Sequence, residues 1–246
     1  MSEFLVGWFK KFPNFKRQEF YIAGESYAGH QVPQLADKIL AMNKGRHRIN
    51  LKGIMHRPLQ LVQPDLHTNT TNSAVHRHHA GLRYIGYDPC ARNYSEAYLN
   101  RADVQRALHA DATRNGRWKL CNDHLFNNWH GSPASVLPVI KKLIMDARLR
   151  VWVYSGDTDA RVPAASTRYA LRKLKLETLR PWRKWFAAGE DQVAGFTVMY
   201  KGGLVYATVR GAGHAVPEFA PIQARQLFSH FLAGRELPAK PKPGII

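Results

Sequence analysis

The stretch EFYIAGESYAGHQVPQLADKIL, residues 19–40, decides the fold expected for this chain. Its first six residues form a short, largely apolar run that ends in glycine, which is typical of a buried strand. Over residues 26–43 the apolar side chains then recur at helical spacing. Ser26 therefore stands at a sharp turn from a strand into a helix. A turn of this kind lifts a serine hydroxyl above the edge of a sheet.

The segment GESYAG at 24–29 matches G-x-S-x-x-G, one residue longer than the strict G-x-S-x-G nucleophile elbow. Gly24 leaves room for a strained turn, and the N–H of Tyr27 at the start of the helix is placed to stabilise an oxyanion. A serine that follows a strand can equally be an ordinary helix N-cap. The motif alone leaves both interpretations of Ser26 open.

Two later strands end in the residue types that a nucleophilic serine needs. The predicted strand 149–155 leads into Asp157 and Asp159, and the predicted strand 203–210 leads into His214. Serine is a weak nucleophile unless a base takes its proton and an acid orients that base. The chain order serine, aspartate, histidine, with each residue after a strand, fits the catalytic triad of α/β-hydrolases.

The acid of this triad has two candidates. Asp157 and Asp159 both lie close enough to the end of the strand to orient the imidazole of His214. Asp157, directly after Gly156, also suits a second role, in which its carboxylate binds backbone N–H groups and caps the turn.

Across the chain, predicted strands alternate with predicted helices, which indicates an α/β fold with a mainly parallel sheet. We expect Ser132 to be the N-cap of a helix and Gly234 to end the last one. The domain is expected to cover residues 1–238, followed by a proline-rich tail at 239–246. Apart from the segments named above, the expected elements are a helix over 1–17 ending near Pro13, a strand over 49–55, helices over 95–110, 132–147, 163–174 and 217–234, and a hairpin over 195–213 that turns at 201–203.

The segment 56–83 breaks this pattern and is expected to be a loop or a disordered insert. It contains five of the twelve histidines, including the tract HRHH at 76–79. This tract has no partner Cys or Asp at ligand spacing, so we expect no metal site, and nothing else in the sequence calls for a cofactor.

The formal net charge of +18 raises the question of a polyanionic partner. The basic residues come in scattered pairs and form no continuous block, so a solvated basic surface is expected rather than nucleic-acid binding. No run reaches transmembrane length, and residues 1–12 lack the apolar core of a signal peptide. Nothing in the sequence predicts the oligomeric state.

Four segments resemble the serine carboxypeptidase family, most closely its plant-type, class II branch. The resemblance implies an α/β-hydrolase fold that releases C-terminal amino acids from peptides, usually at acidic pH in a secreted, vacuolar or lysosomal setting. The segments are GESYAGHQVPQLADKIL (24–40), YDPCARNYSEAYLNRADVQRALHA (87–110), VWVYSGDTDARVPAASTRYAL (151–171) and VRGAGHAVPEFAPIQA (209–224).

The same resemblance implies a role for each candidate site residue. It makes Ser26 the nucleophile, His214 the base and Asp159, rather than Asp157, the acid. It gives one oxyanion donor to the Tyr27 N–H and places Glu25 at the site that holds the C-terminal carboxylate of the substrate. Glu25 can bind a carboxylate only as a protonated donor, which fits acidic working conditions.

The chain also departs from the family pattern. The family's W-x-N-G-G-P-G-C-S-S motif, which supplies the second oxyanion N–H, has no counterpart here, so we expect an incomplete, N-terminally truncated hydrolase fold. Segment 56–83 is unlike the family's cap insertion, and Ala215 stands where class II members usually have Glu. The resemblance further implies that Cys90 and Cys121 lack their usual partners.

These departures leave other functions open. An acyltransferase of the same fold is one alternative, although Glu25 and Ala28 favour a peptidase; a catalytically impaired fragment is the other. Loss of the flanking strands would leave the strand at 19–24 with an exposed edge. The sequons at Asn69 and Asn93 would carry glycans only in a secreted protein.

Overall fold

The computed structural model describes residues 1–45, 48–57, 91–110, 116–122, 124–125, 128–130, 133–189 and 191–241. The chain divides into two compact units, Met1–Ile85 with Pro133–Ile246, and Gly86–Ser132. The predicted insert beyond residue 57, with its HRHH tract and the sequon at Asn69, lies outside the described residues, as does Cys90. The larger unit holds every candidate catalytic residue.

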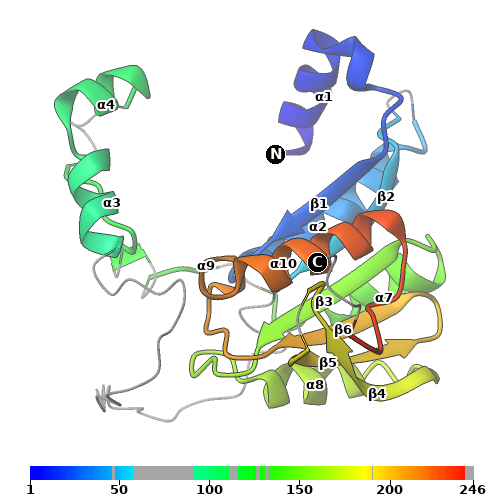
Figure 1. Cartoon of the computed structure of the whole chain (residues 1–246). Coiled ribbons are helices and arrows are strands. Elements are labelled where there is room, and N and C mark those ends of the chain that lie inside the picture. Colours follow the sequence, from blue (N-terminus) through cyan, green and yellow to red (C-terminus); the bar gives the residue numbers. More distant parts are fainter. Residues whose placement is uncertain are drawn as a thin grey trace, which may run out of the picture. The chain divides into compact units, whose positions relative to one another are not determined.

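A six-stranded sheet runs through this larger unit in the order β1-β2-β3-β6-β5-β4 (Figure 1). The first four strands in this order are parallel, and β5 and β4 continue the sheet in antiparallel pairing. The expected mainly parallel α/β sheet is therefore confirmed. The strands are β1 (Phe20–Gly24), β2 (Leu51–His56), β3 (Arg150–Gly156), β4 (Thr178–Phe186), β5 (Val193–Tyr200) and β6 (Leu204–Val209).

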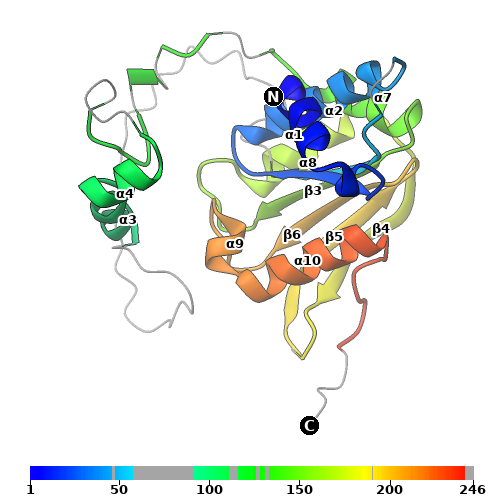
Figure 2. The same cartoon turned by 90° about the horizontal axis from the view of Figure 1, so that it is seen from above.

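Helices cover both faces of the sheet (Figure 2). On one face α2 (Ala28–Met42), α7 (Leu137–Met145) and α8 (Ala164–Arg172) form a core cluster with the strands. On the other face α10 (Pro221–Ala233) packs its Leu227 and Phe231 into a second cluster with Trp152 of β3. Burial on both faces explains why the apolar residues of β3 are consecutive rather than alternating with polar ones.

Strand β4 was not predicted from the sequence. Its residues, TLRPWRKWF, are mostly exposed or half-buried, and the run includes a proline and three basic side chains. A strand with this composition is tolerated at the edge of a sheet, where one side of the backbone needs no partner. Pairing with β5, which follows it in the chain, holds β4 in place.

Several predicted helices have different bounds in the structure. The helix predicted over 1–17 is α1 (Ser2–Lys11), followed by the 3-10 turn η1 (Pro13–Phe15). The helix predicted over 217–234 is two helices, α9 (Val216–Phe219) and α10, because Pro221 has no N–H to continue the first and suits the first turn of the second. Gly234 ends α10 in a left-handed conformation, as predicted.

The prediction of an N-cap at Ser132 is wrong, because α7 begins at Leu137 and its N-cap is Val136. The hydroxyl of Ser135 accepts the backbone N–H of Leu137 instead. In the smaller unit the helix predicted over 95–110 is likewise two helices, α3 (Ala91–Leu99) and α4 (Ala102–Ala107). Between them the Asn100 side chain bonds both backbone groups of Trp118, which competes with helix continuation.

Strand β1 ends the sheet on one side, and its Ala23 is exposed. This matches the expectation of an open edge next to the candidate nucleophile. Within the described part of the chain, no helix combines the length and the apolarity needed to cross a bilayer.

Candidate active site

Four parallel strands end at the same edge of the sheet, and the residues that follow them converge there. Ser26 comes after β1, Arg57 after β2, Asp159 after β3 and His214 after β6. In open α/β sheets this carboxyl edge is where ligands bind. Three of the four residues were predicted from the sequence; Arg57 was not.

The turn between β1 and α2 holds Ser26 in a strained conformation. Its φ of 60° lies in the left-handed region, which costs a residue with a side chain roughly 1–2 kcal/mol. The backbone N–H groups of Ala28 and Gly29 bond the carbonyls of Glu25 and Ser26, which closes the turn tightly. A Cβ at Gly24 would lie 2.5 Å from the Ala28 Cβ, so only glycine allows this approach of strand and helix.

The structure brings Ser26, His214 and Asp159 together. The Ser26 Oγ lies 2.9 Å from the Nε2 of His214. On the other side of the ring, the Nδ1 lies 3.3 Å and 3.4 Å from the two carboxylate oxygens of Asp159. The imidazole is half-buried, whereas Asp159 is only 5% exposed.

The two candidate acids have different partners. Asp159 accepts the backbone N–H groups of Arg161 and Val162, at 2.8 and 3.2 Å, in addition to facing the imidazole. Asp157 accepts the backbone N–H of Gly211 at 2.7 Å. The contact of Asp157 is therefore that of a residue that caps a turn. Asp159 is the carboxylate beside His214.

The turns after β3 and β6 are joined to each other. The backbone N–H and the hydroxyl of Thr158 both donate to the carbonyl of Ala212, at 3.1 and 2.8 Å. A Cβ at Gly156 would lie 2.2 Å from the same carbonyl oxygen and 2.3 Å from that of Gly213. Because the two turns pack this closely, the positions of Asp159 and His214 are fixed relative to each other.

Arg57 is the residue at this edge that sequence reasoning missed. Its side chain is 1% exposed; its NH1 lies 3.3 Å from the Nε2 of His214, and its NH2 contacts the Oδ2 of Asp159. Its backbone N–H donates to the carbonyl of Gly24 at 3.0 Å. The one available signal was position: residue 57 follows a predicted parallel strand and so falls at the same edge as the other strand ends.

The environment shifts the pKa of two candidate residues in opposite directions. Burial, together with the positive charges of Arg57 and Arg161, lowers the pKa of His214 to about 4. Burial raises the pKa of Glu25; Arg57 opposes this shift, and the charge of Glu218 adds to it. The imidazole is therefore neutral over a wide pH range, while Glu25 keeps its proton to a higher pH than an exposed carboxyl.

The remaining predicted residues occupy varied positions. Glu25 and Tyr27 flank Ser26 and are half-buried, and the ring of Tyr27 stacks on that of His30 with centroids 5.5 Å apart. Asn93 is exposed on α3 in the smaller unit, where Cys121 is an exposed free thiol. Among the described residues no cluster of three or more His, Cys, Asp or Glu has the arrangement of a metal site.

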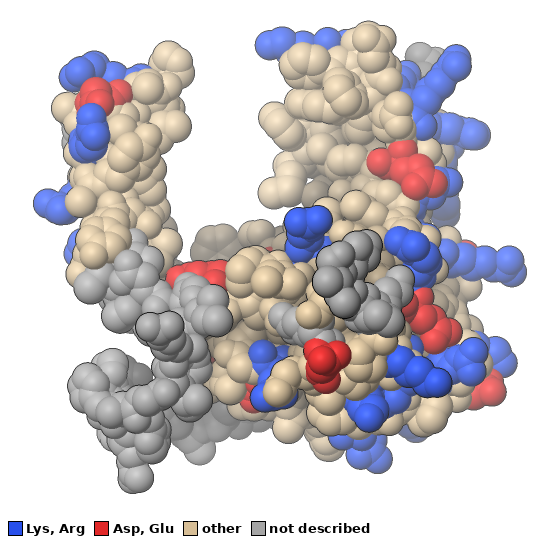
Figure 3. Space-filling model, in the orientation of Figure 1, with Lys and Arg blue, Asp and Glu red and all other residues tan. Residues whose placement is uncertain are grey.

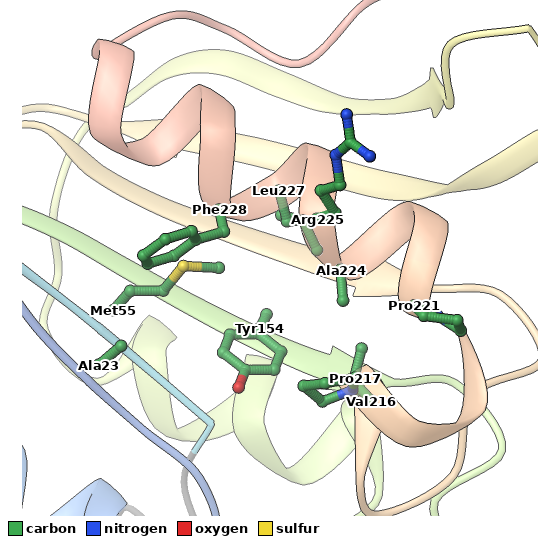
Figure 4. Close-up of a pocket in the computed structure, with 10 residues that line it drawn as sticks. All are labelled: Ala23, Met55, Tyr154, Val216, Pro217, Pro221, Ala224, Arg225, Leu227 and Phe228. Atoms are coloured by element: carbon green, nitrogen blue, oxygen red, sulfur yellow. The ribbon is translucent and has the colours of Figure 1, made fainter.

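An apolar cavity of about 350 Å³ lies between the sheet and α10 (Figure 4). Tyr154 of β3 and Phe228 of α10 project into it from opposite sides. Val216 and Pro217, which follow His214 closely in the chain, form one end of it. The cavity therefore borders the candidate site and offers mainly apolar surface.

Lysine and arginine side chains are spread over the face of the molecule drawn in Figure 3, with acidic side chains among them. They do not gather into a continuous stripe on that face.

Comparison with known proteins adds to this geometry. Residues 1–80 and 56–234 match the profile of the family described as Serine carboxypeptidase. Serine carboxypeptidase-like 34 of Arabidopsis thaliana is 37% identical over 97% of this chain and 64% of its own length. Serine carboxypeptidase 24 of the same plant is also 37% identical, over 96% of this chain and 65% of its own. The chain thus spans less than two thirds of the length of these relatives.

Among solved structures, the chain is similar to Kex1(delta)p, a prohormone-processing carboxypeptidase from Saccharomyces cerevisiae. The TM-score is 0.71 over 94% of this chain and 65% of that one, with 16% sequence identity. A likeness at this identity establishes the fold, which is that of the α/β-hydrolases.

Proposed function

The chain belongs to the serine carboxypeptidase family, and we propose that it hydrolyses C-terminal residues from peptides through a covalent acyl-enzyme. One observation carries the proposal above all others. A strained serine after β1 lies 2.9 Å from a histidine nitrogen, and the opposite nitrogen of that ring faces a buried carboxylate. Nucleophile, base and orienting acid in this order are what activates a serine hydroxyl.

In the proposed reaction the Ser26 Oγ attacks the carbonyl carbon of the last peptide bond while His214 Nε2 takes the hydroxyl proton. Asp159 holds the ring with Nδ1–H toward its carboxylate and stabilises the imidazolium that forms. The Tyr27 N–H binds the oxyanion. His214 then passes the proton to the leaving amino group, and a water molecule, activated by the same imidazole, releases the shortened peptide from Ser26.

Glu25 is proposed to hold the C-terminal carboxylate of the substrate. Two carboxyl groups attract each other only when one is protonated and donates a hydrogen bond. The raised pKa of Glu25 supports this role, because it extends the pH range in which the proton is present. The same requirement favours catalysis at acidic pH.

The apolar cavity beside the site is proposed to receive an apolar side chain of the substrate. It shares the segment after His214 with the catalytic edge, and its lining is mainly aliphatic and aromatic. Replacing Ala224 with Phe would reduce the space and is expected to raise KM for substrates with large apolar residues more than for those with alanine.

The proposal is tested with N-blocked dipeptides that end in a free carboxylate or in an amide. The full chain is expected to release the terminal amino acid from the free acid at pH 4–6, and Ser26→Ala is expected to reduce the rate by about 10⁴ or more. The amide should be cleaved more slowly because its neutral carbonyl accepts a weaker hydrogen bond from protonated Glu25 than a carboxylate does. Equal release by wild type and Ser26→Ala would show that Ser26 is not the nucleophile.

A catalytically impaired form of the enzyme is the second candidate, and one observation favours it. Arg57 places a buried positive charge in contact with both His214 and Asp159. Proton transfer from Ser26 to His214 would create a second positive charge, the imidazolium, beside it.

A further inference from the structure

We infer that Arg57 restrains the catalytic triad by occupying groups that Ser26 and His214 need. This inference rests on the proposed function, because it concerns the same site. The guanidinium touches the imidazole at the nitrogen nearest the serine and touches the carboxylate that orients the imidazole. Arg57 is thus a positioning residue, and its effect on the triad is inhibitory.

The first contact concerns the lone pair that must receive the serine proton. With Nδ1–H toward Asp159, the Nε2 of a neutral imidazole has one lone pair. The Ser26 hydroxyl lies 2.9 Å from this nitrogen and the Arg57 NH1 lies 3.3 Å from it. Two donors therefore compete for one acceptor, and whenever the guanidinium holds it, the hydroxyl has no base.

The second contact concerns Asp159. The NH2 of Arg57 contacts Oδ2, one of the two oxygens that face the Nδ1 of His214. The imidazole lies 3.3 and 3.4 Å from this carboxylate, whereas a charge-assisted hydrogen bond is usually about 2.7–2.9 Å long. Sharing the carboxylate with Arg57 accounts for this distance and weakens the support for the imidazolium.

The charges around His214 also disfavour formation of the imidazolium. Asp159 and Arg161 face it from the loop after β3, Arg57 from the end of β2, and the neutral Ser26 hydroxyl from the turn after β1. Among the described residues that face the ring, one anion stands against two cations, of which Arg57 is buried and poorly screened by solvent. Each turnover must form an imidazolium in this field.

Besides Asp159 and His214, the ionisable groups that act on the charge of Arg57 are Glu25, Tyr154 and Tyr206. Its backbone N–H donates to the carbonyl of Gly24 at the end of β1. Its Nε has no hydrogen-bond partner among the described residues. The guanidinium is thus incompletely satisfied where it lies.

The restraint is tested by measuring how fast a fluorophosphonate labels Ser26 in the full chain between pH 4 and pH 8. The variants are Arg57→Met and Arg57→Gln, which remove the charge, and Arg57→Lys, which keeps it. Neutral variants are expected to react about tenfold faster or more, because a buried unit charge a few ångströms away changes the energy of the imidazolium strongly. Arg57→Lys should remain much closer to wild type.

Arg161→Met is the matched control. It removes a second positive charge near His214, but Arg161 is exposed and therefore screened, so its effect should be well below that of Arg57→Met. In the neutral Arg57 variants the acid limb of the pH profile should move to higher pH. A purely structural role for Arg57 would lower the labelling rate without moving that limb.

A second measurement does not depend on reactivity. The His214 pKa is followed by NMR of the imidazole nitrogens in Ser26→Ala, with and without Arg57→Met, and its signals are assigned by their loss in His214→Gln. The pKa is expected to rise by about one unit or more when the charge is removed. An unchanged pKa, or labelling that is equal or slower in both neutral variants, would overturn the restraint. If the pKa rises while neither wild type nor any variant is labelled, the restraint stands and the proposed hydrolase function fails.

Discussion

The ends of β3 and β6 and the end of β2 lie at the same edge of one sheet, yet they are built differently. The turns after β3 and β6 bond each other through Thr158 and Ala212, and their glycines allow close packing. At the end of β2, both ring nitrogens of the fully buried His56 and the Nε of Arg57 have no partner within the described residues.

Residues that converge at one sheet edge therefore need not share one role in the proposed machinery. Asp159 is held by backbone N–H groups in the geometry that an orienting acid requires. Arg57 contacts the same imidazole with a buried charge, which in the proposed mechanism would oppose the proton transfer. In the proposed mechanism the turns after β3 and β6 are pre-organised for the reaction, whereas the end of β2 buries polar groups at an energetic cost.

The largest expected effect distinguishes the two aspartates in the turn after β3, Asp157 and Asp159. Asp159→Asn should lower kcat by roughly 10⁴, because an amide no longer fixes the tautomer of His214 or stabilises the imidazolium. Asp157→Asn should cost less than about tenfold, since it alters only the cap on the Gly211 N–H. Steady-state hydrolysis of a blocked dipeptide measures both. Equal losses would mean that the two carboxylates share the role.

The packing between the turns after β3 and β6 is tested by Gly156→Ala. The added methyl group would lie 2.2 Å from the Ala212 carbonyl oxygen, and overpacking of this kind costs typically 1–3 kcal/mol of unfolding free energy. Urea unfolding measures the loss. Gly7→Ala is the control, because nothing lies within 4 Å of the new Cβ and alanine is the better helix former in α1. A neutral Gly156→Ala would show that the turns are loosely packed.

The end of β2 is tested through the pH dependence of stability. Burial, with the charge of His30, lowers the pKa of His56 to about 3. A histidine with a depressed folded-state pKa contributes stability that is complete above its unfolded value of about 6.5 and is lost as the pH falls toward the folded value. At pH 4 this linkage amounts to about 3 kcal/mol at most.

His56→Leu should remove that loss, so the variant is expected to gain stability relative to wild type as the pH falls from 6.5 to 4. Thermal unfolding at several pH values, with the exposed His109→Leu as control, provides the measurement. Parallel curves for wild type and His56→Leu would mean that His56 is not held neutral by burial.

The smallest expected effect concerns Glu25 at the end of β1. Its pKa is raised by burial, so the protonated form persists above the ordinary range, and the associated stability is lost as the pH rises through the folded-state value. Glu25→Gln keeps a donor at all pH values. We expect KM for a free-acid substrate to change less than about tenfold in this variant, and we expect KM no longer to rise with pH. A pH dependence of KM equal to that of wild type would mean that Glu25 does not bind the substrate carboxylate.

The sequence was sufficient to predict the elements whose residues follow regular patterns. The apolar run before Ser26, the Gly-rich strand ends before Asp159 and His214, and the hairpin turning near residue 202 all follow local rules, and each lies where it was expected. Strand β4 escaped because its exposed, basic composition carries no alternating pattern, and pairing with β5 decides its conformation.

Arg57 could not be predicted for a different reason. Its importance comes from contacts with Asp159 and His214, which are more than a hundred positions away in the chain, and a residue just beyond the end of a predicted strand gives no local signal. Similarly, spacing alone left Asp157 and Asp159 both open as the acid, and only the family resemblance favoured Asp159. Which carboxylate faces the ring is a matter of tertiary packing.

The most direct test of the triad is to treat the folded full chain with a serine-directed phosphonate and locate the adduct by peptide mass spectrometry. We expect a single adduct on Ser26, absent in Ser26→Ala and slowed at least about a thousandfold in His214→Gln, because the hydroxyl reacts only when the imidazole takes its proton. An adduct on another serine, or one on Ser26 that forms equally fast without His214, would contradict the proposed triad.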